Sequence, residues 1–141
     1  MEPIPLPDDV RRLMSAPNYV HLSTLRADGT PRNWVVWVDV EGDHVLVCTG
    51  DGALKAKDMV RNAAVGLSVT SADDPYDMAA VQGRVVEVRD DADGCYMNPI
   101  SVKYTGEPFP MTGPGRVCFV IAPVRAGSRK LGFVHAPASG S

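Results

Sequence analysis

The sequence predicts a mainly β fold in which about six antiparallel strands form a closed or nearly closed barrel, together with a few short helices. Segments rich in β-branched and aromatic residues recur along the chain. Turn residues such as Asp28-Gly29 and Gly42-Asp43 separate the first of these segments. The strands are therefore joined as hairpins, which argues against a mostly parallel sheet, because parallel strands need helical crossovers.

The length of the chain fits one domain over residues 1–141, which is large enough to bury a core without a disulfide or a structural metal. The formal net charge is −3, and the small excess of acids is spread along the chain. This pattern excludes a broad nucleic-acid-binding surface, which needs many cations on one face. We expect residues 1–6 and 136–141 to be flexible.

The cysteines and the N-terminal segment indicate the compartment. Cys48, Cys95 and Cys118 are odd in number, and we interpret them as small buried hydrophobes in a reducing compartment. The first residues lack the basic and apolar regions of a signal peptide, and no apolar run is long enough to cross a bilayer. The sequence therefore predicts a cytoplasmic protein with no membrane partner.

The first element is a predicted helix in the segment PDDVRRLMSA. Asp8 or Asp9 can cap this helix, and Val10, Leu13 and Met14 recur at helical spacing. Strands are then predicted over residues 19–26, 32–40, 44–50, 64–71, 78–88 and 115–124, of which the first three form an antiparallel meander. A further short helix is expected over residues 99–104, before Gly106 and Pro108 end it.

The second of these strands is apolar on both sides. Trp34, Val36 and Val38 point to one face, whereas Val35 and Trp37 point to the other, because side chains alternate along a strand. We therefore expect both faces of this strand to be covered.

A helix is predicted over residues 53–62, where Ala56, Met59, Val60 and Ala63 recur at helical spacing. This helix also carries the main cluster of cations in the chain, Lys55, Lys57 and Arg61. Like charges four positions apart destabilise a helix, and cations in the first turn meet the positive end of the helix dipole. A bound anion would satisfy these charges and the free N–H groups of the first turn. In the alternative interpretation, the cations pair with Asp58 on a solvated face.

Other candidate sites are weak. His21, His44 and His135 have no second ligand at metal spacing, and we expect no metal site. Cys48 has no base partner visible in the sequence, and no phosphate-binding glycine motif is present. No residue stands out as a catalytic acid or base.

The order LSTLRADGTPR, WVVWVDVEGDHVLVCTG, KAKDMVRNAAV, DDPYDMAAVQGRVVEV and KYTGEPFP resembles the pyridoxamine 5′-phosphate oxidase-like superfamily of split β-barrel flavin and deazaflavin proteins. Within it, the chain is similar to the branch that uses the deazaflavin coenzyme F420. The resemblance covers residues 17–124. It implies a split β-barrel, a homodimer with sites at the interface, and a lysine that contacts the cofactor phosphate, followed two positions later by a second basic residue. Lys55 and Lys57 occupy these places, although Ala53 stands where the family often has Ser or Thr.

The resemblance also implies where the cofactor ring lies. Family members lay the ring along the second and third strands, here at Val36-Trp37 and Cys48-Thr49. Aromatic residues after an Asp-rich turn reach the cofactor from the other subunit. Tyr76 fits this place, and Met78 fits the next one, where an aromatic residue is more usual.

The function implied by the resemblance is an F420-dependent reductase that transfers a hydride between the deazaflavin and an electron-poor small molecule. Lys57 and Arg61 would bind the acidic tail that F420 has and FMN lacks. One alternative is an FMN-binding oxidoreductase of the same fold. Another is a protein without catalytic activity that stores or delivers the cofactor, or that binds another planar ligand.

Overall fold

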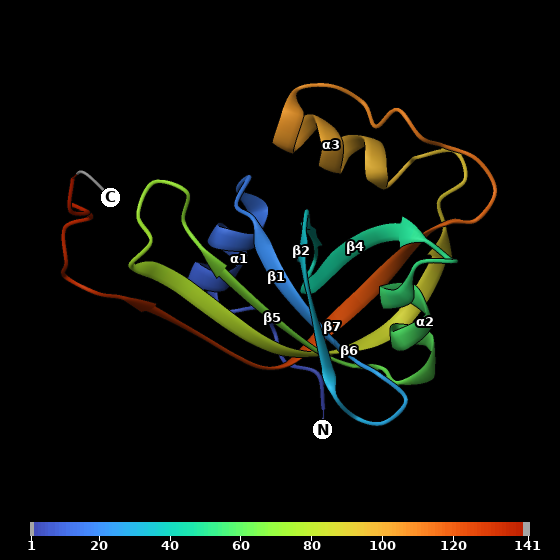
Figure 1. Cartoon of the computed structure of the whole chain (residues 1–141), viewed down its shortest axis with the longest axis horizontal. Helices are drawn as coiled ribbons and strands as arrows, with labels where there is room; N and C mark the ends of the chain where they lie inside the picture. The colour runs from blue at the N-terminus through green and yellow to red at the C-terminus, as the bar shows by residue number, and fades with distance from the viewer. Residues whose placement is uncertain (1, 140–141) are drawn as a thin grey trace.

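Seven antiparallel strands form one sheet in the computed structural model, which describes residues 2–139. The strands are β1 (Val20–Leu25), β2 (Pro31–Val36), β3 (Asp39–Glu41), β4 (His44–Gly50), β5 (Ala64–Thr70), β6 (Asp77–Asp90) and β7 (Arg116–Lys130). The helices are α1 (Asp8–Ser15), α2 (Leu54–Arg61) and α3 (Met97–Thr105). The sheet order is β2-β1-β5-β6-β7-β4-β3 (Figure 1). This architecture confirms the predicted mainly β split barrel with short helices.

The predicted continuous strand over residues 32–40 is wrong, because the chain breaks it at Trp37 and Val38. The first half, β2, pairs with β1, whereas the second half, β3, pairs with β4. β2 and β3 are the two edges of the sheet, so the expected three-stranded meander does not form. Two residues thus join the opposite edges and close the sheet into a split barrel. We call the line where these edges meet the seam.

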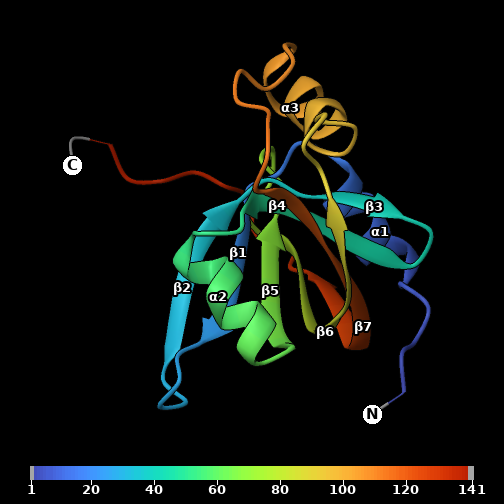
Figure 2. The ribbon, with the colours of Figure 1, turned by 90° about the vertical axis from the view of Figure 1, so that its right-hand side faces the viewer.

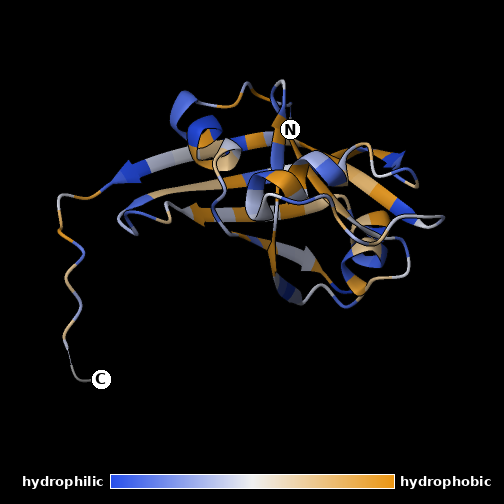
Figure 3. Ribbon diagram, turned by 90° about the horizontal axis from the view of Figure 1, so that it is seen from above, coloured by the Kyte–Doolittle hydropathy of each residue, from blue (hydrophilic) through white to orange (hydrophobic). Residues whose placement is uncertain are grey.

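The core of the barrel consists of inward-facing side chains of the strands together with Leu6 and buried side chains of α1 and α2. Figure 3 shows hydrophobic segments on both the strands and the helices. The predicted stripe of Val10, Leu13 and Met14 is at most 1% exposed. The predicted capping by Asp8 or Asp9 is wrong: Pro7 occupies the N-cap position, and both acids lie in the first turn. There they still complement the helix dipole.

The helix α2 lies against β1 and β2 (Figure 2). Ala56 and Met59 are buried, as predicted, but Val60 is 73% exposed, because the apolar stripe is narrower than the spacing suggested. The strand β7 continues to Lys130, beyond the predicted end at residue 124, because it pairs with the start of β6.

The helix α3 covers a second, smaller core on the outer side of β4 and β7. This core contains Leu46, Ile100, Cys118 and Val120. The prediction that all cysteines are buried is wrong for Cys95, which is exposed in the turn before α3.

The ends of the chain differ in their contacts. The Ile4 N–H group donates to the Pro123 carbonyl oxygen at 2.8 Å, and Leu6 is 4% exposed. The C-terminal segment leaves the body of the molecule after β7 (Figure 1). The flexibility expected for residues 1–6 and 136–141 stays a prediction, and residues 1, 140 and 141 lie outside the described part. Between residues 2 and 139, no helix has the length and apolarity needed to cross a membrane.

Candidate functional site

A groove of about 290 Å³ lies between β2 and β4 at the seam. Its lining residues come from β2, the β2–β3 connection, β4, α2, α3, the segment that leads into β7 and the start of β7: Val35, Val36, Trp37, Cys48, Thr49, Lys55, Met97, Phe109 and Arg116. In the described residues β2 pairs with β1 alone, and β3 pairs with β4 only over residues 44–46. Part of the main chain along the groove is therefore free to form hydrogen bonds with a ligand.

Five of the nine residues predicted to bind a cofactor come together in this groove. They are Val36, Trp37, Cys48, Thr49 and Lys55. Sequence positions 36–37, 48–49 and 55 converge because the seam places the end of β2 beside the end of β4, and α2 begins shortly after β4.

The aromatic wall of the groove is Trp37, which α3 holds in place. The Trp37 and Tyr104 rings are stacked, with centroids 5.2 Å apart and planes 9° apart. Phe109 meets the Trp37 ring edge-on at 6.4 Å. The Tyr104 hydroxyl donates to the Asn18 carbonyl oxygen at 2.6 Å and accepts the Val38 N–H group at 3.2 Å. These contacts fix a flat, apolar surface at the seam.

Lys55 lies in the first turn of α2, half-buried in the groove. Its ammonium group is 4.9 Å from the centroid of the Trp34 ring. Burial lowers the pKa of Lys55, and the positive charge of Arg116 lowers it further. Ala53 gives α2 no side-chain cap, so the first N–H groups of the helix are available to an anion. The cation and the helix terminus thus favour the same kind of ligand.

Arg61 forms an ion pair with Asp58, as expected in the alternative interpretation of the cationic cluster. Its guanidinium donates to the Asp58 carboxylate at 2.8 Å and to the Leu25 carbonyl oxygen at 2.9 Å. Lys57 is exposed on the outer side of α2. Neither residue lines the groove, although both remain on the helix that begins there.

The sequence prediction missed four of the groove residues, Val35, Met97, Phe109 and Arg116, and Arg116 is the charged one among them. It is the first residue of β7 and the ladder partner of Gly50 at the end of β4. Its guanidinium carbon lies 5.2 Å from the centroid of the Phe109 ring. The only signal in the sequence is an arginine after a Gly-Pro-Gly turn, which does not predict proximity to Lys55.

Tyr76 and Met78 lie outside the groove of their own chain. Tyr76 packs against Phe133 and His135 of the C-terminal segment, with ring centroids 5.3 Å and 6.4 Å away. Met78 lines a hollow of about 560 Å³ on the outer face of the sheet. In this chain the two residues are separate from the other predicted site residues.

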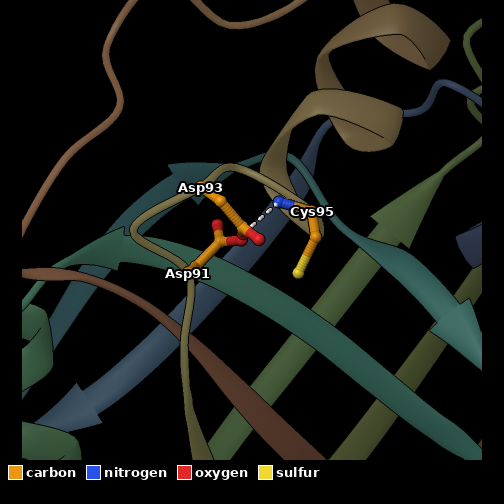
Figure 4. Close-up of side chains that lie close together, drawn as sticks. All are labelled: Asp91, Asp93 and Cys95. Carbon is orange, nitrogen blue, oxygen red and sulfur yellow. Dashed lines mark hydrogen bonds between the residues drawn. The ribbon is translucent and has the colours of Figure 1, made fainter.

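Three potential metal ligands, Asp91, Asp93 and Cys95, lie together before α3 (Figure 4). The Asp91 carboxylate accepts the N–H groups of Tyr96 and Met97 at 2.8 Å and 3.2 Å. The Asp93 carboxylate accepts the Cys95 N–H group at 3.0 Å. These bonds to the main chain account for the positions of both acids, which shape the turn that leads into α3.

A family model and several solved structures match most of the chain. A family model described as pyridoxamine 5′-phosphate oxidase matches residues 6–130. A solved structure described as an F420 reductase is 28% identical, with a TM-score of 0.76, and the match covers 86% of this chain and 98% of that one. No curated protein matches the sequence.

Two further solved structures share the fold at lower identity. A conserved hypothetical protein from Mycobacterium tuberculosis is 18% identical, with a TM-score of 0.76 and coverage of 99% of this chain and 95% of that one. General Stress Protein 26 from Bacillus anthracis is 19% identical, with a TM-score of 0.67 and coverage of 86% and 92%.

Proposed function

Because the chain belongs to the pyridoxamine 5′-phosphate oxidase family, we propose that it is an oxidoreductase that binds the deazaflavin coenzyme F420 in the groove at the seam. The observation that carries the proposal is that three features meet in this groove: an aromatic wall, free strand edges, and two cations that form no ion pair with an acid within residues 2–139. The similarity to a protein described as an F420 reductase supports the choice of cofactor.

The residues of the groove fit such a cofactor. Lys55 and the first turn of α2 would bind its phosphate, because both present positive charge and free donors. The main chain at Val36-Trp37 and Cys48-Thr49 would bind the ring. When bound, the coenzyme supplies a hydride, and an electron-poor small molecule such as an enone or a quinone would accept it. The protein then contributes binding, orientation and exclusion of water.

FMN is the second candidate cofactor, and one observation favours it. Of the two cations expected to bind the acidic tail of F420, Arg61 forms an ion pair with Asp58. Lys57, which is exposed, is then the one left for the tail, and FMN needs no such cation. Because Lys55 suits the phosphate of either cofactor, the reason to prefer F420 is the 28% identical relative.

We also propose that the protein is a homodimer with its sites at the interface. Two hollows of about 410 Å³ and 560 Å³ lie on the outer face of β1, β5 and β6, and small residues such as Gly66, Ser68 and Ala80 line them. Val35, at the groove, is 63% exposed, and Val134 in the C-terminal segment is 84% exposed. A second copy would cover these surfaces and would bring Tyr76 and Met78 to a groove that is not their own.

The test is a titration of the cofactor-free protein with F420 and, separately, with FMN, followed by fluorescence. We expect Lys55→Ala to weaken binding of the preferred cofactor about tenfold to a hundredfold, because a hydrogen bond to a charged group is lost. Arg26→Ala removes an exposed cation in the β1–β2 turn and serves as the control.

The outcomes separate the candidates. Preference for F420, with oxidation of the reduced coenzyme by an enone or a quinone, supports the proposal. Preference for FMN moves the assignment to the flavin branch, and binding without turnover indicates a carrier. Equal affinity of the Lys55→Ala variant and the unaltered protein would place the phosphate elsewhere.

A further inference from the structure

We propose that Arg116 is a second cationic ligand of the groove, which binds the same phosphate group as Lys55. The identification of the anion as a cofactor phosphate rests on the proposed function. The existence of an anion site formed by these two residues rests on the structure alone.

The position of Arg116 is fixed by its main chain. Its N–H group donates to the Gly113 carbonyl oxygen at 3.3 Å, and its own carbonyl oxygen accepts the Asp91 N–H group at 2.8 Å. Its guanidinium lies on the Phe109 ring, which itself contacts Trp37. The side chain is therefore held at the groove before any ligand arrives.

The Nε atom of Arg116 is buried and has no hydrogen-bond partner; across residues 2–139 it is the one buried side-chain nitrogen or oxygen atom of which this is true. A buried donor without an acceptor costs about 1–3 kcal/mol, so such atoms are rare in folded proteins. Other arginines of the described chain, including Arg12, Arg32 and Arg89, bind carboxylates. Arg116 has no such ion pair in the described residues.

Lys55 lines the same groove, and the charge of Arg116 is close enough to lower its pKa. Two like charges in a half-buried groove repel each other unless an anion lies between them. A phosphate between them would neutralise this repulsion, accept hydrogen bonds from the guanidinium of Arg116 and bind the free N–H groups of the first turn of α2. The planar guanidinium suits the oxygens of a phosphate, to which it can donate two parallel hydrogen bonds.

An acid within the protein is the alternative partner. Asp51 lies close by, since a Cβ atom built on Gly115 would be 3.2 Å from its carboxylate. Asp51 is exposed, and within the described residues its carboxylate does not reach an ion-pair distance from Arg116. Movement of this side chain onto Arg116 would satisfy the guanidinium without a ligand, so the experiment has to detect the phosphate directly.

The experiment compares FMN with riboflavin, which has the same ring and no phosphate. Binding to the unaltered protein and to Arg116→Gln, Arg116→Lys and Arg26→Gln variants is measured by ligand fluorescence. We expect Arg116→Gln to weaken FMN binding about tenfold to a hundredfold and to change riboflavin binding less than about twofold. Arg116→Lys keeps the charge but loses the planar fork, so its effect should be intermediate, and Arg26→Gln should have none.

Inorganic phosphate separates this inference from the proposed function. Lys55 lies over Trp34, so phosphate binding is expected to change tryptophan fluorescence in the absence of any cofactor. If neither F420 nor FMN binds but phosphate does, and Arg116→Gln abolishes this signal, the anion site stands and the cofactor assignment fails. Equal losses for FMN and riboflavin, or unchanged FMN binding in a folded Arg116→Gln variant, would overturn the role of Arg116.

Discussion

At the scale of single residues, Asp58 stabilises the fold by binding one cation of its own helix, Arg61, and one of β2, Arg32. The Asp58 carboxylate is 1% exposed. It accepts from the Thr24 hydroxyl at 2.8 Å, from Arg32 Nε at 2.9 Å and from Arg61 at 2.8 Å. The hydrogen bond from Arg32 is the main reason that the pKa of Asp58 falls to about 2. The carboxylate therefore joins α2 to β1 and β2.

We predict that Asp58→Asn lowers the free energy of unfolding by about 3 kcal/mol at pH 7, because it leaves two arginines without their counter-charge. Urea unfolding measures this difference. An Asp side chain in the unfolded chain titrates near 3.8, so the folded protein holds its proton less tightly. The stabilisation is complete above about pH 4 and is lost as the pH falls towards 2. The difference between the two proteins should shrink over this range.

Arg61→Gln is the matched comparison for this prediction. The Arg61 side chain is 41% exposed, and Arg32 still binds Asp58 when Arg61 is absent. We expect a smaller loss of stability than with Asp58→Asn. A difference between Asp58→Asn and the unaltered protein that stays constant from pH 4 to pH 2 would contradict the role of the ionised carboxylate.

The residues of the groove show what local sequence can and cannot reveal. Lys55 could be identified from the sequence because a cation in the first turn of a helix is unfavourable, and its presence there needs an explanation. Arg116 breaks no local rule. Its partners are visible only when β4 and β7 pair, which brings Gly50 and Arg116 together across 66 positions of sequence.

At the scale of elements, α3 determines the shape of the seam. Tyr104 binds the main chain at two places, at Asn18 before β1 and at Val38 between β2 and β3. The Lys103 ammonium group donates to the carbonyl oxygens of Met14 and Val38. A helix of nine residues is too short to be stable alone. Its contacts with the seam therefore hold the helix and the Trp37 ring together.

We predict that Tyr104→Phe lowers the free energy of unfolding by about 2 kcal/mol, because it removes two hydrogen bonds and leaves their main-chain partners without them. The near-ultraviolet circular dichroism of Trp37 should weaken, since its stacking partner is no longer held in place. Urea unfolding and the spectrum of the folded variant measure the two effects.

Tyr19→Phe is the control for Tyr104→Phe. The Tyr19 ring lies 6.0 Å from the Tyr104 ring but is 60% exposed. Its hydroxyl forms no side-chain hydrogen bond in the described residues. We expect little change in this variant. Equal losses in both variants would mean that Tyr104 acts through ring packing and not through its hydroxyl.

The sequence predicted the type of most elements but not the break between β2 and β3. Residues 34–38 are apolar without interruption, so nothing in the pattern marks Trp37 as the end of a strand. The break arises from pairing: Val36 is opposite Val20 on β1, whereas Asp39 is opposite Leu46 on β4. A change of strand partner depends on tertiary structure, which local periodicity does not encode.

At the scale of the whole molecule, the outer face of the sheet is the surface to test for self-association. We predict that the protein sediments as a dimer and that Ser68→Arg shifts it to the monomer. Ser68 is exposed at the centre of this face, with His21 and Ala80 as its ladder partners. A bulky cation there would prevent close approach of a second copy. Analytical ultracentrifugation measures the masses.

Val102→Arg is the control, because Val102 is 47% exposed on α3, away from the outer face. It should leave the dimer intact. A monomer of unaltered protein at micromolar concentration would exclude the dimer, and with it the assignment of Tyr76 and Met78 to a partner's groove.

The seam also has a consequence for the life of the protein in solution. A strand edge without a partner is a template on which another chain can add a strand, the first step towards cross-β aggregates. Pro31 begins β2 without an N–H group, and β2 ends after six residues, so the edge is short. A ligand along this edge would cover it further. In the protein without a ligand, the exposed edge of β2 is therefore a site where aggregation can begin, and it is the same edge that we expect to bind the cofactor.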